Sequence, residues 1–217
     1  MTLQGERAPR GRSPSRAPLI VTALGVALVA AMAYDTRIVT IGGEHDVQAE
    51  VFSPATFGAS AFPEIRTSVE TRAQDAAQLS SELAADKAAA TEKYGISGGT
   101  GPVFPVKFTG TVGEGKSGLF KVAVPGMPPE TTVRVQTGPA INGTDLRDAT
   151  GTIAFGQFKN QIEYQNAGAA INDQMKKDVL AGIDNSALTG KTVTVTGVFR
   201  LVNPKSWLVT PVAMSVQ

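Results

Sequence analysis

The distribution of apolar and polar positions divides the chain into three parts. Residues 17–34 form an unbroken apolar run, filled in with alanine and without a charged side chain. A second part, from about Pro63 to Tyr94, repeats apolar residues every three or four positions, which is the period of a helix. After about residue 102 the period falls to two, which is typical of strands with one buried face. The pattern therefore predicts an apolar segment, a helical region and a β-rich domain.

The helical region has its own start and stop signals. Pro63 suits the first turn of a helix and Gly95 suits its end. Asp86 is a good N-cap residue and predicts a second short helix that runs to Tyr94. The stretch Ile96–Pro102, with three glycines and a proline, is interpreted as a flexible hinge before the β-rich domain.

The β-rich domain alternates strands with one helical segment. The helical period returns only over about 160–182, where Ile171, Met175 and Val179 step by four. Asn142-Gly143 is a hairpin-type turn signal. The strands are predicted over 106–112, 119–124, 132–136, 152–155, 192–201 and 207–216, the fourth extending or bending the third.

This order predicts an α+β protein with an OB-like, five-stranded β-barrel and one helix between strands 3 and 4. A β-sandwich is the alternative, but it leaves the helix over 160–182 unexplained. The predicted parts are a cytoplasmic tail (1–16), a membrane segment (17–34), an extended and helical stalk (35–101) and the OB-like domain (102–217).

The apolar run has two interpretations. Eighteen residues at about 1.5 Å each give a helix of roughly 27 Å, close to the hydrocarbon core of a bilayer. The run is long for a secretory signal core, which favours a single-pass transmembrane anchor. A signal peptide cleaved after Ala33 is the alternative, because Ala31-Met32-Ala33 supplies small residues before Tyr34. Four arginines precede the run, so either interpretation puts the body outside the cytoplasmic membrane.

The amino-acid composition excludes several classes of function. The chain has 217 residues, no cysteine and one histidine, which excludes disulfides, thiol catalysis and imidazole-rich metal sites. Residues 1–33 hold four of the 20 basic and one of the 19 acidic residues, so the remainder carries 16 basic and 18 acidic side chains. A slightly acidic body without a basic cluster is a poor match for nucleic acid. We expect no cofactor, no metal site and no catalytic residue.

Two motifs carry a resemblance over nearly the whole chain. They are Gly138–Ala149 and Phe155–Tyr164, together with Lys93-Tyr94-Gly95 and a closing Gly-Lys-Thr-Val-x-Val-Thr-Gly-x-Phe at Gly190–Phe199. In this combination the chain resembles the bacterial DUF2291 family of predicted periplasmic lipoproteins. It departs from the family label because it has no cysteine to carry a lipid. Members are often encoded beside sugar ABC transporters, so the resemblance implies subunits of such a transporter as partners.

The same motifs supply the candidate binding residues. Asp145, Arg147 and Asp148 either form a polar site for a carboxylate or sugar hydroxyls, or a structural ion pair. Asn160 and Gln161 could bind hydroxyls, although Asn160 is equally an N-cap whose capping box ends in Glu163.

Tyr164 completes the candidate site, because its ring can stack on a sugar. The sequence predicts a membrane-tethered accessory or binding module of a sugar-uptake system. The alternatives are a glycan-acting hydrolase that uses Asp145 or Asp148, and a stand-alone small-ligand-binding protein.

Overall fold

The computed structural model describes residues 17–36, 52–99 and 101–217, with only the backbone of residues 17–19. Two compact units divide the chain, Met1–Val51 and Phe52–Gln217. The predicted cytoplasmic tail (1–16) and the amino-terminal part of the predicted stalk, residues 37–51, lie outside the described residues.

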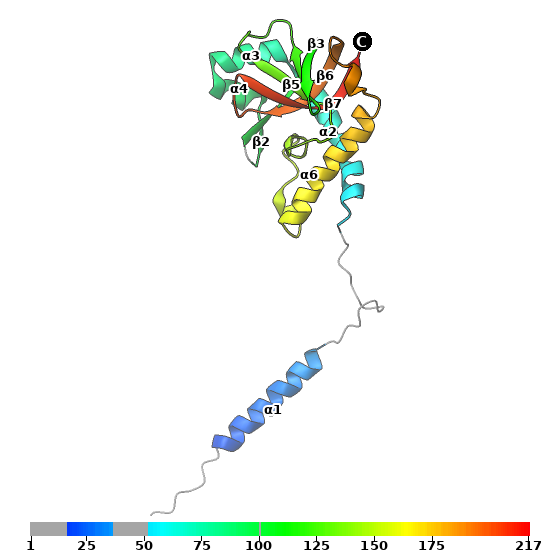
Figure 1. Ribbon diagram of the computed structural model, residues 1–217. Helices are drawn as coiled ribbons and strands as arrows, with labels where there is room; N and C mark the ends of the chain where they lie inside the picture. The colour runs from blue at the N-terminus through cyan, green and yellow to red at the C-terminus, as the bar shows by residue number, and fades with distance from the viewer. Residues whose placement is uncertain (1–16, 37–51, 100) are drawn as a thin grey trace, which may run out of the picture. The chain divides into compact units, whose positions relative to one another are not determined.

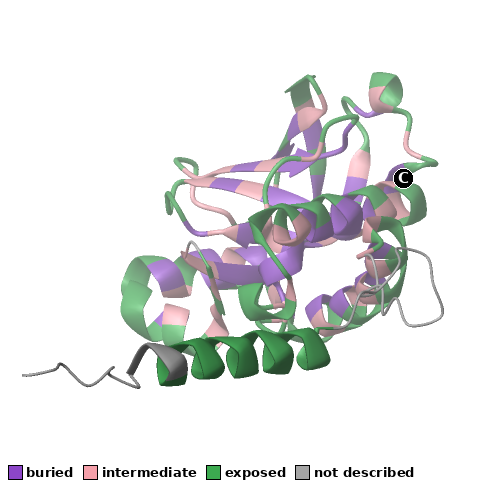
Figure 2. Cartoon of the chain, turned by 90° about the horizontal axis from the view of Figure 1, so that it is seen from below, coloured by how far each residue is buried: buried purple, intermediate pink, exposed green. Residues whose placement is uncertain are grey.

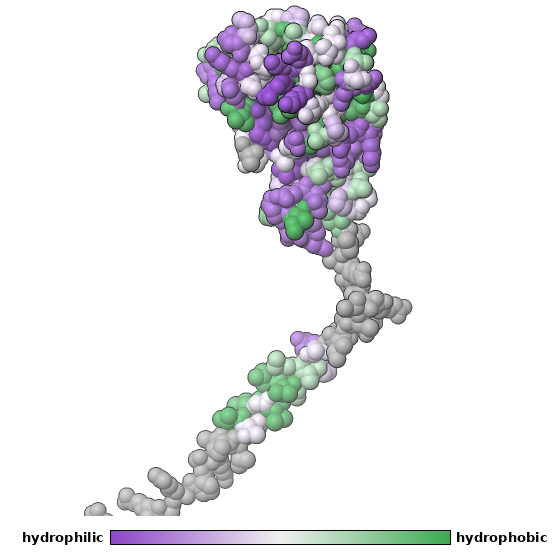
Figure 3. All heavy atoms as spheres, in the orientation of Figure 1, coloured by the Kyte–Doolittle hydropathy of each residue, from purple (hydrophilic) through white to green (hydrophobic). Residues whose placement is uncertain are grey.

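In the first unit, the predicted helix over the apolar run is confirmed as α1 (Ala17–Asp35). From Ile20 onward its described side chains are exposed, and hydrophobic atoms cover most of its surface (Figure 3). Crossing a bilayer takes about 20 apolar residues. Among the described residues, no helix is both long and apolar enough for this. The prediction that this helix spans a membrane is therefore not supported.

The second unit is built around one sheet of seven strands (Figure 1). The strands are β1 (Gln74–Asp75), β2 (Ile96–Gly98), β3 (Gly101–Lys116), β4 (Leu119–Ala123), β5 (Thr132–Gln136), β6 (Thr192–Arg200) and β7 (Ser206–Val216). Hydrogen bonding passes from β3 to β4, β5, β7 and β6, and β6 pairs again with β3. The path through these five strands therefore closes. The pair β5–β7 is parallel and the other pairs of the path are antiparallel.

The period of two that predicted these strands reflects their burial. In β4, Phe120 and Val122 are buried, whereas Lys121 between them is exposed. Large aromatic rings from β3, β6 and β7 fill the centre: Phe199 stacks on Trp207 with ring centroids 4.2 Å apart and on Phe104 at 5.6 Å. Figure 2 shows buried residues along the strands and on the helix faces turned toward them.

Helices pack against the sheet, and two of them lie in the connection between β5 and β6. The helices are α2 (Pro54–Arg72), α3 (Ala76–Ala85), α4 (Lys87–Tyr94), α5 (Asp145–Asp148) and α6 (Gln161–Met175), which continues as a π-helical turn over Lys176–Leu180. Short 3₁₀ turns cover Phe155–Gln157 and Asn185–Ala187. In chain order, β5 and β6 are the third and fourth of the five strands in the closed path, and the helix predicted between them is confirmed as α6.

The helices α2 and α6 pack against each other and share a second apolar cluster with the strands. Phe62 and Val69 of α2 meet Ile171 and Met175 of α6 there, and all four are buried. Gly58 lies directly against the backbone of Ala170, so that a Cβ at this position would overlap the Ala170 carbonyl oxygen. The absence of a side chain at Gly58 therefore lets the two helices approach closely.

Residues 52–101, predicted as a stalk, belong to this same compact unit. The predicted helix start at Pro63 is wrong: α2 begins at Pro54 with Ser53 as its N-cap, and Pro63 lies inside it. Pro63 is on the exposed side, where water can satisfy the carbonyl that lacks its amide partner. The start at Asp86 is confirmed, because its carboxylate accepts hydrogen bonds from the amides of Ala88 and Ala89.

Three loop predictions are also corrected. Ile96–Pro102 is no hinge, because β2 and the first residues of β3 pair within it. The segment Thr152–Phe155 forms no strand, and its end enters a 3₁₀ turn. Asn142-Gly143 does not join two strands but leads into α5, and the positive φ of Gly143 serves this turn. A local turn signal does not specify which element follows it.

Candidate functional site

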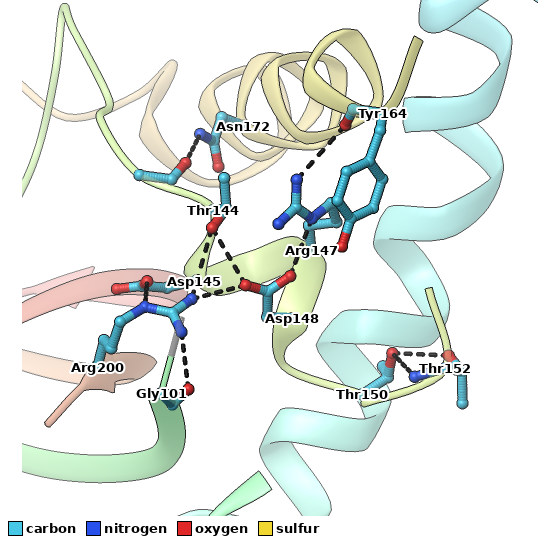
Figure 4. Close-up of polar contacts among 11 residues, drawn as sticks. Gly101, Thr144, Asp145, Arg147, Asp148, Thr150, Thr152, Tyr164, Asn172 and Arg200 are labelled. Carbon is cyan, nitrogen blue, oxygen red and sulfur yellow. Dashed lines mark hydrogen bonds and ion pairs between the residues drawn. The ribbon is translucent and has the colours of Figure 1, made fainter. Parts of the chain in front are cut away.

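The candidate residues Asp145, Arg147 and Asp148 lie on α5, a single helical turn packed beneath α6 (Figure 4). Asp148 and Arg147 are buried and Asp145 is partly buried. Thr144, which precedes α5, donates a hydrogen bond from Oγ1 to Asp148 Oδ2 at 3.1 Å. The polar side chains of α5 thus face into the protein.

Arg200, at the end of β6, joins both carboxylates of α5. Its Nε lies 3.0 Å from Asp145 Oδ1 and its Nη2 lies 2.7 Å from Asp148 Oδ2. Its Nη1 donates to the carbonyl of Gly101, at the start of β3, at 2.7 Å (Figure 4). One guanidinium therefore ties α5 to two strands.

Arg147 approaches Asp148 from the other side. Its Nε lies 2.9 Å from Asp148 Oδ1, so that each oxygen of this carboxylate contacts a guanidinium. The guanidinium carbon of Arg147 lies 3.7 Å from the centre of the Tyr164 ring, a cation–π contact. Arg147 thus links the ion pairs to the start of α6.

Burial dominates the electrostatics of Asp145. Its loss of hydration raises the pKa of Asp145 above the ordinary value, and the neighbouring charge of Arg200 works in the opposite direction. With two acids and two guanidinium groups in contact, the charges of the cluster balance. The arrangement fits the structural ion-pair interpretation, because its donors and acceptors face one another.

Asn160 and Gln161 lie apart from these ion pairs, at the first residues of α6. Asn160 Oδ1 accepts a hydrogen bond from the Glu163 amide, and Glu163 Oε2 accepts one from the Lys159 amide, both at 2.9 Å. The interpretation of Asn160 as an N-cap is therefore confirmed. Gln161 is exposed.

Aromatic rings gather beside this helix start. Phe158 lies 5.5 Å from Phe52 and from Phe57, and 5.3 Å from Tyr164, between ring centroids. Phe155 adds an edge contact to Tyr164 at 5.6 Å. We call Phe155, Phe158, Ile162 and Tyr164 the aromatic patch.

Two members of the aromatic patch face solvent. Ile162 is 67% exposed and Phe155 is 50% exposed. Figure 3 shows hydrophobic atoms among hydrophilic ones at the end of the unit where α6 begins. The exposed Phe155 ring thus rests on a cluster of contacting aromatic rings.

The sequence did not indicate Arg200 or Thr144 as members of the cluster. Arg200 ends a strand 52 positions after Asp148, and only the tertiary fold brings them together. The charge balance of α5 could have indicated a further cation. The segment has two acids and one arginine, so if both carboxylates are buried, one of them needs a cation from elsewhere in the chain. In the described part of the chain, no group of three or more histidine, cysteine, aspartate or glutamate residues could hold a metal ion.

Comparison with a solved structure identifies the fold class. A crystal structure of an OB-fold protein from Thermotoga maritima superimposes with a TM-score of 0.60, at 18% sequence identity, over 77% of this chain and all of that chain. This likeness shows an OB-type fold in a mixed α+β protein. No curated protein matches the sequence.

The family follows from the sequence model that matches residues 23–215, described as predicted periplasmic lipoprotein. The chain belongs to this family, DUF2291, and the resemblance stated from its motifs is confirmed. The family description makes the protein extracytoplasmic.

Proposed function

We propose that this protein is an extracytoplasmic accessory module that binds a protein partner and catalyses no reaction. The family supports the location, and the aromatic patch is the observation that carries the binding function. Exposed apolar side chains on a rigid support, with polar neighbours, are the usual composition of a protein interface.

The partner we propose is a subunit of a sugar ABC transporter. The support for a protein partner is the composition of the candidate surface: the exposed apolar Phe155 and Ile162 are close in sequence to the exposed polar Asn160 and Gln161. The choice of a sugar-uptake system rests on the family resemblance alone.

The contacts of the two acids argue against the hydrolase alternative. A glycosidase needs one carboxylic acid and one carboxylate with access to the glycosidic bond. Asp148 is buried between two guanidinium groups, and Asp145 is held by Arg200. Neither has the open setting that the chemistry requires.

Photo-crosslinking in cells tests the proposal. A photoreactive residue at Gln161 or Ile162 is expected to capture permease or substrate-binding subunits of a sugar transporter, identified by mass spectrometry. Val216 is the control position, because it is an exposed apolar residue paired with Val193 at the end of β6 remote from Arg200. Ile162→Glu is expected to reduce binding of the captured subunit about tenfold.

Equal capture from positions 162 and 216, or none at 162, would overturn the proposed interface. Incubation with glycans tests the alternative. Turnover by the wild-type protein that Asp148→Asn abolishes while the fold stays intact would establish a hydrolase.

A further inference from the structure

The outer face of β4 and β5 carries a group of cations. Lys121 and Arg134 are register partners in this antiparallel pair, so their side chains lie next to each other on one face. Lys116 lies close by, opposite Leu119 at the end of β3. Within the described residues, none of these three cations takes part in an ion pair.

These cations line a hollow of about 440 Å³. We call it the basic hollow, and its lining residues are Glu114, Gly115, Lys116, Ser117, Leu119, Lys121 and Arg134. Three cations and one carboxylate give this lining a net positive charge. The volume lies in the range of small-molecule sites.

The hollow has a rigid edge. Ser117 and Gly118 both have positive φ, as the two central residues of a tight hairpin turn between β3 and β4 require. The Gly118 carbonyl accepts a hydrogen bond from the Thr137 amide at 2.8 Å, which fixes the turn against the segment after β5. The position of Lys116 is therefore determined by the fold.

Arg134 is held in place with part of its hydrogen-bonding capacity unused. Its Nη2 donates to Ser206 Oγ of β7 at 3.0 Å. Its Nε is buried and has no hydrogen-bond partner among the described residues. A guanidinium donates hydrogen bonds to carboxylate and phosphate groups, so an oxyanion in the hollow would accept from the Arg134 donors that line it and not from the buried Nε.

Like charges directly opposite each other destabilise a sheet. Lys121 and Arg134 are such a pair, and a neutral residue at either position would remove this repulsion. We propose that the basic hollow binds the oxyanion group, carboxylate or phosphate, of a small solute. The slightly acidic body of the protein disfavours long polyanions such as nucleic acid.

Calorimetric titration of the purified full chain tests the proposal. The probes are galacturonate for a carboxylate, glucose 6-phosphate for a phosphate, and glucose as the uncharged control. At least one acidic probe is expected to bind, more weakly as sodium chloride is raised, and glucose is expected not to bind. The acidic probe that binds identifies the source of the oxyanion.

The variants Arg134→Gln and Lys121→Gln are each expected to weaken binding about tenfold or more. Lys107→Gln is the matched control, because Lys107 is an exposed lysine on the neighbouring strand β3 outside the basic hollow. Thermal unfolding checks the fold, and Lys121→Gln is expected to unfold no lower than the wild type because a repulsion is removed. Equal binding by Arg134→Gln and wild type, equal binding of glucose, no binding of either acid, or binding of single-stranded DNA alone would overturn the proposal.

Discussion

Among single residues, Arg200 joins α5 to β3 through two ion pairs and a hydrogen bond. Its side chain is 11% exposed and the side chain of its partner Asp148 is 2% exposed. Water can therefore solvate neither charge well, and each charge is stabilised by the other. The same geometry on a surface contributes little, because water already solvates both ions. Burial therefore decides the contribution of this ion pair.

Arg200→Met is expected to lower the free energy of unfolding by about 3–5 kcal/mol, because it leaves the Asp145 carboxylate without a cation and the buried Asp148 carboxylate with Arg147 alone. Urea denaturation measures the change. Arg66→Met is the matched control: Arg66 lies 2.9 Å from Glu70 on α2, but both side chains are 43% exposed. Its loss is expected to cost at most about 0.5 kcal/mol. Similar costs for both variants would show that burial does not set the strength of the Arg200 pairs.

The residues that the sequence singled out are divided by the fold according to their surroundings. Asp145, Arg147 and Asp148 turn inward and form ion pairs that Arg200 completes, whereas Gln161 stays exposed. Their clustering in the sequence was visible, but their burial was not. The position of Arg200 depends on the pairing of β6 with β3, a long-range contact that local patterns do not encode.

Among the elements, α6 has the most varied surroundings. It begins with a capping box beside the aromatic patch, packs along α2, and ends in a π-helical turn. Two glycines lie on the buried side of this pair. Gly58 of α2 contacts the backbone of Ala170, while Gly168 of α6 has ordinary spacing to its neighbours.

The two glycines predict opposite effects. Gly58→Ala is expected to destabilise the unit by about 1–3 kcal/mol, because its methyl group overlaps the Ala170 carbonyl and forces the helices apart. Gly168→Ala, where the nearest atom would be 3.8 Å from the new methyl group, is expected to stabilise by about 0.5–1 kcal/mol through helix propensity. Thermal or urea unfolding measures both. Stabilisation by Gly58→Ala would contradict the close helix contact.

Element prediction from the sequence succeeded where period and burial agree. The alternation in β4 and the four-residue steps in α6 each follow from one buried face, so a local pattern was enough. It failed at Pro63. A proline usually indicates the first turn of a helix, but here it lies on the exposed side in the middle of a longer helix. It failed at Thr152–Phe155 because a short apolar stretch can serve a turn as well as a strand.

For the whole molecule, the family description and the apolar helix α1 bear on where in the cell the protein is located. We expect the wild-type chain outside the cytoplasm, as fractionation and protease accessibility will show. Leu24→Arg combined with Leu28→Arg is expected to hold the chain in the cytoplasm, because it puts two charges into the apolar run. Leucine-to-isoleucine changes at both positions keep the run apolar and serve as the control. A cytosolic wild-type protein would contradict the prediction, and a mature chain that starts at Tyr34 would identify a cleaved signal.

The pairing of β3 with β6 also bears on when the protein can fold. Nine residue pairs join these strands, from Val103 with Arg200 to Thr111 with Thr192, and the partners are 81 to 97 positions apart in the chain. Contacts between such distant segments form slowly, since a long loop must be ordered before they contribute. The strand path cannot close until β6 and β7 have both been synthesised. The sheet of the nascent polypeptide therefore stays open during most of its synthesis.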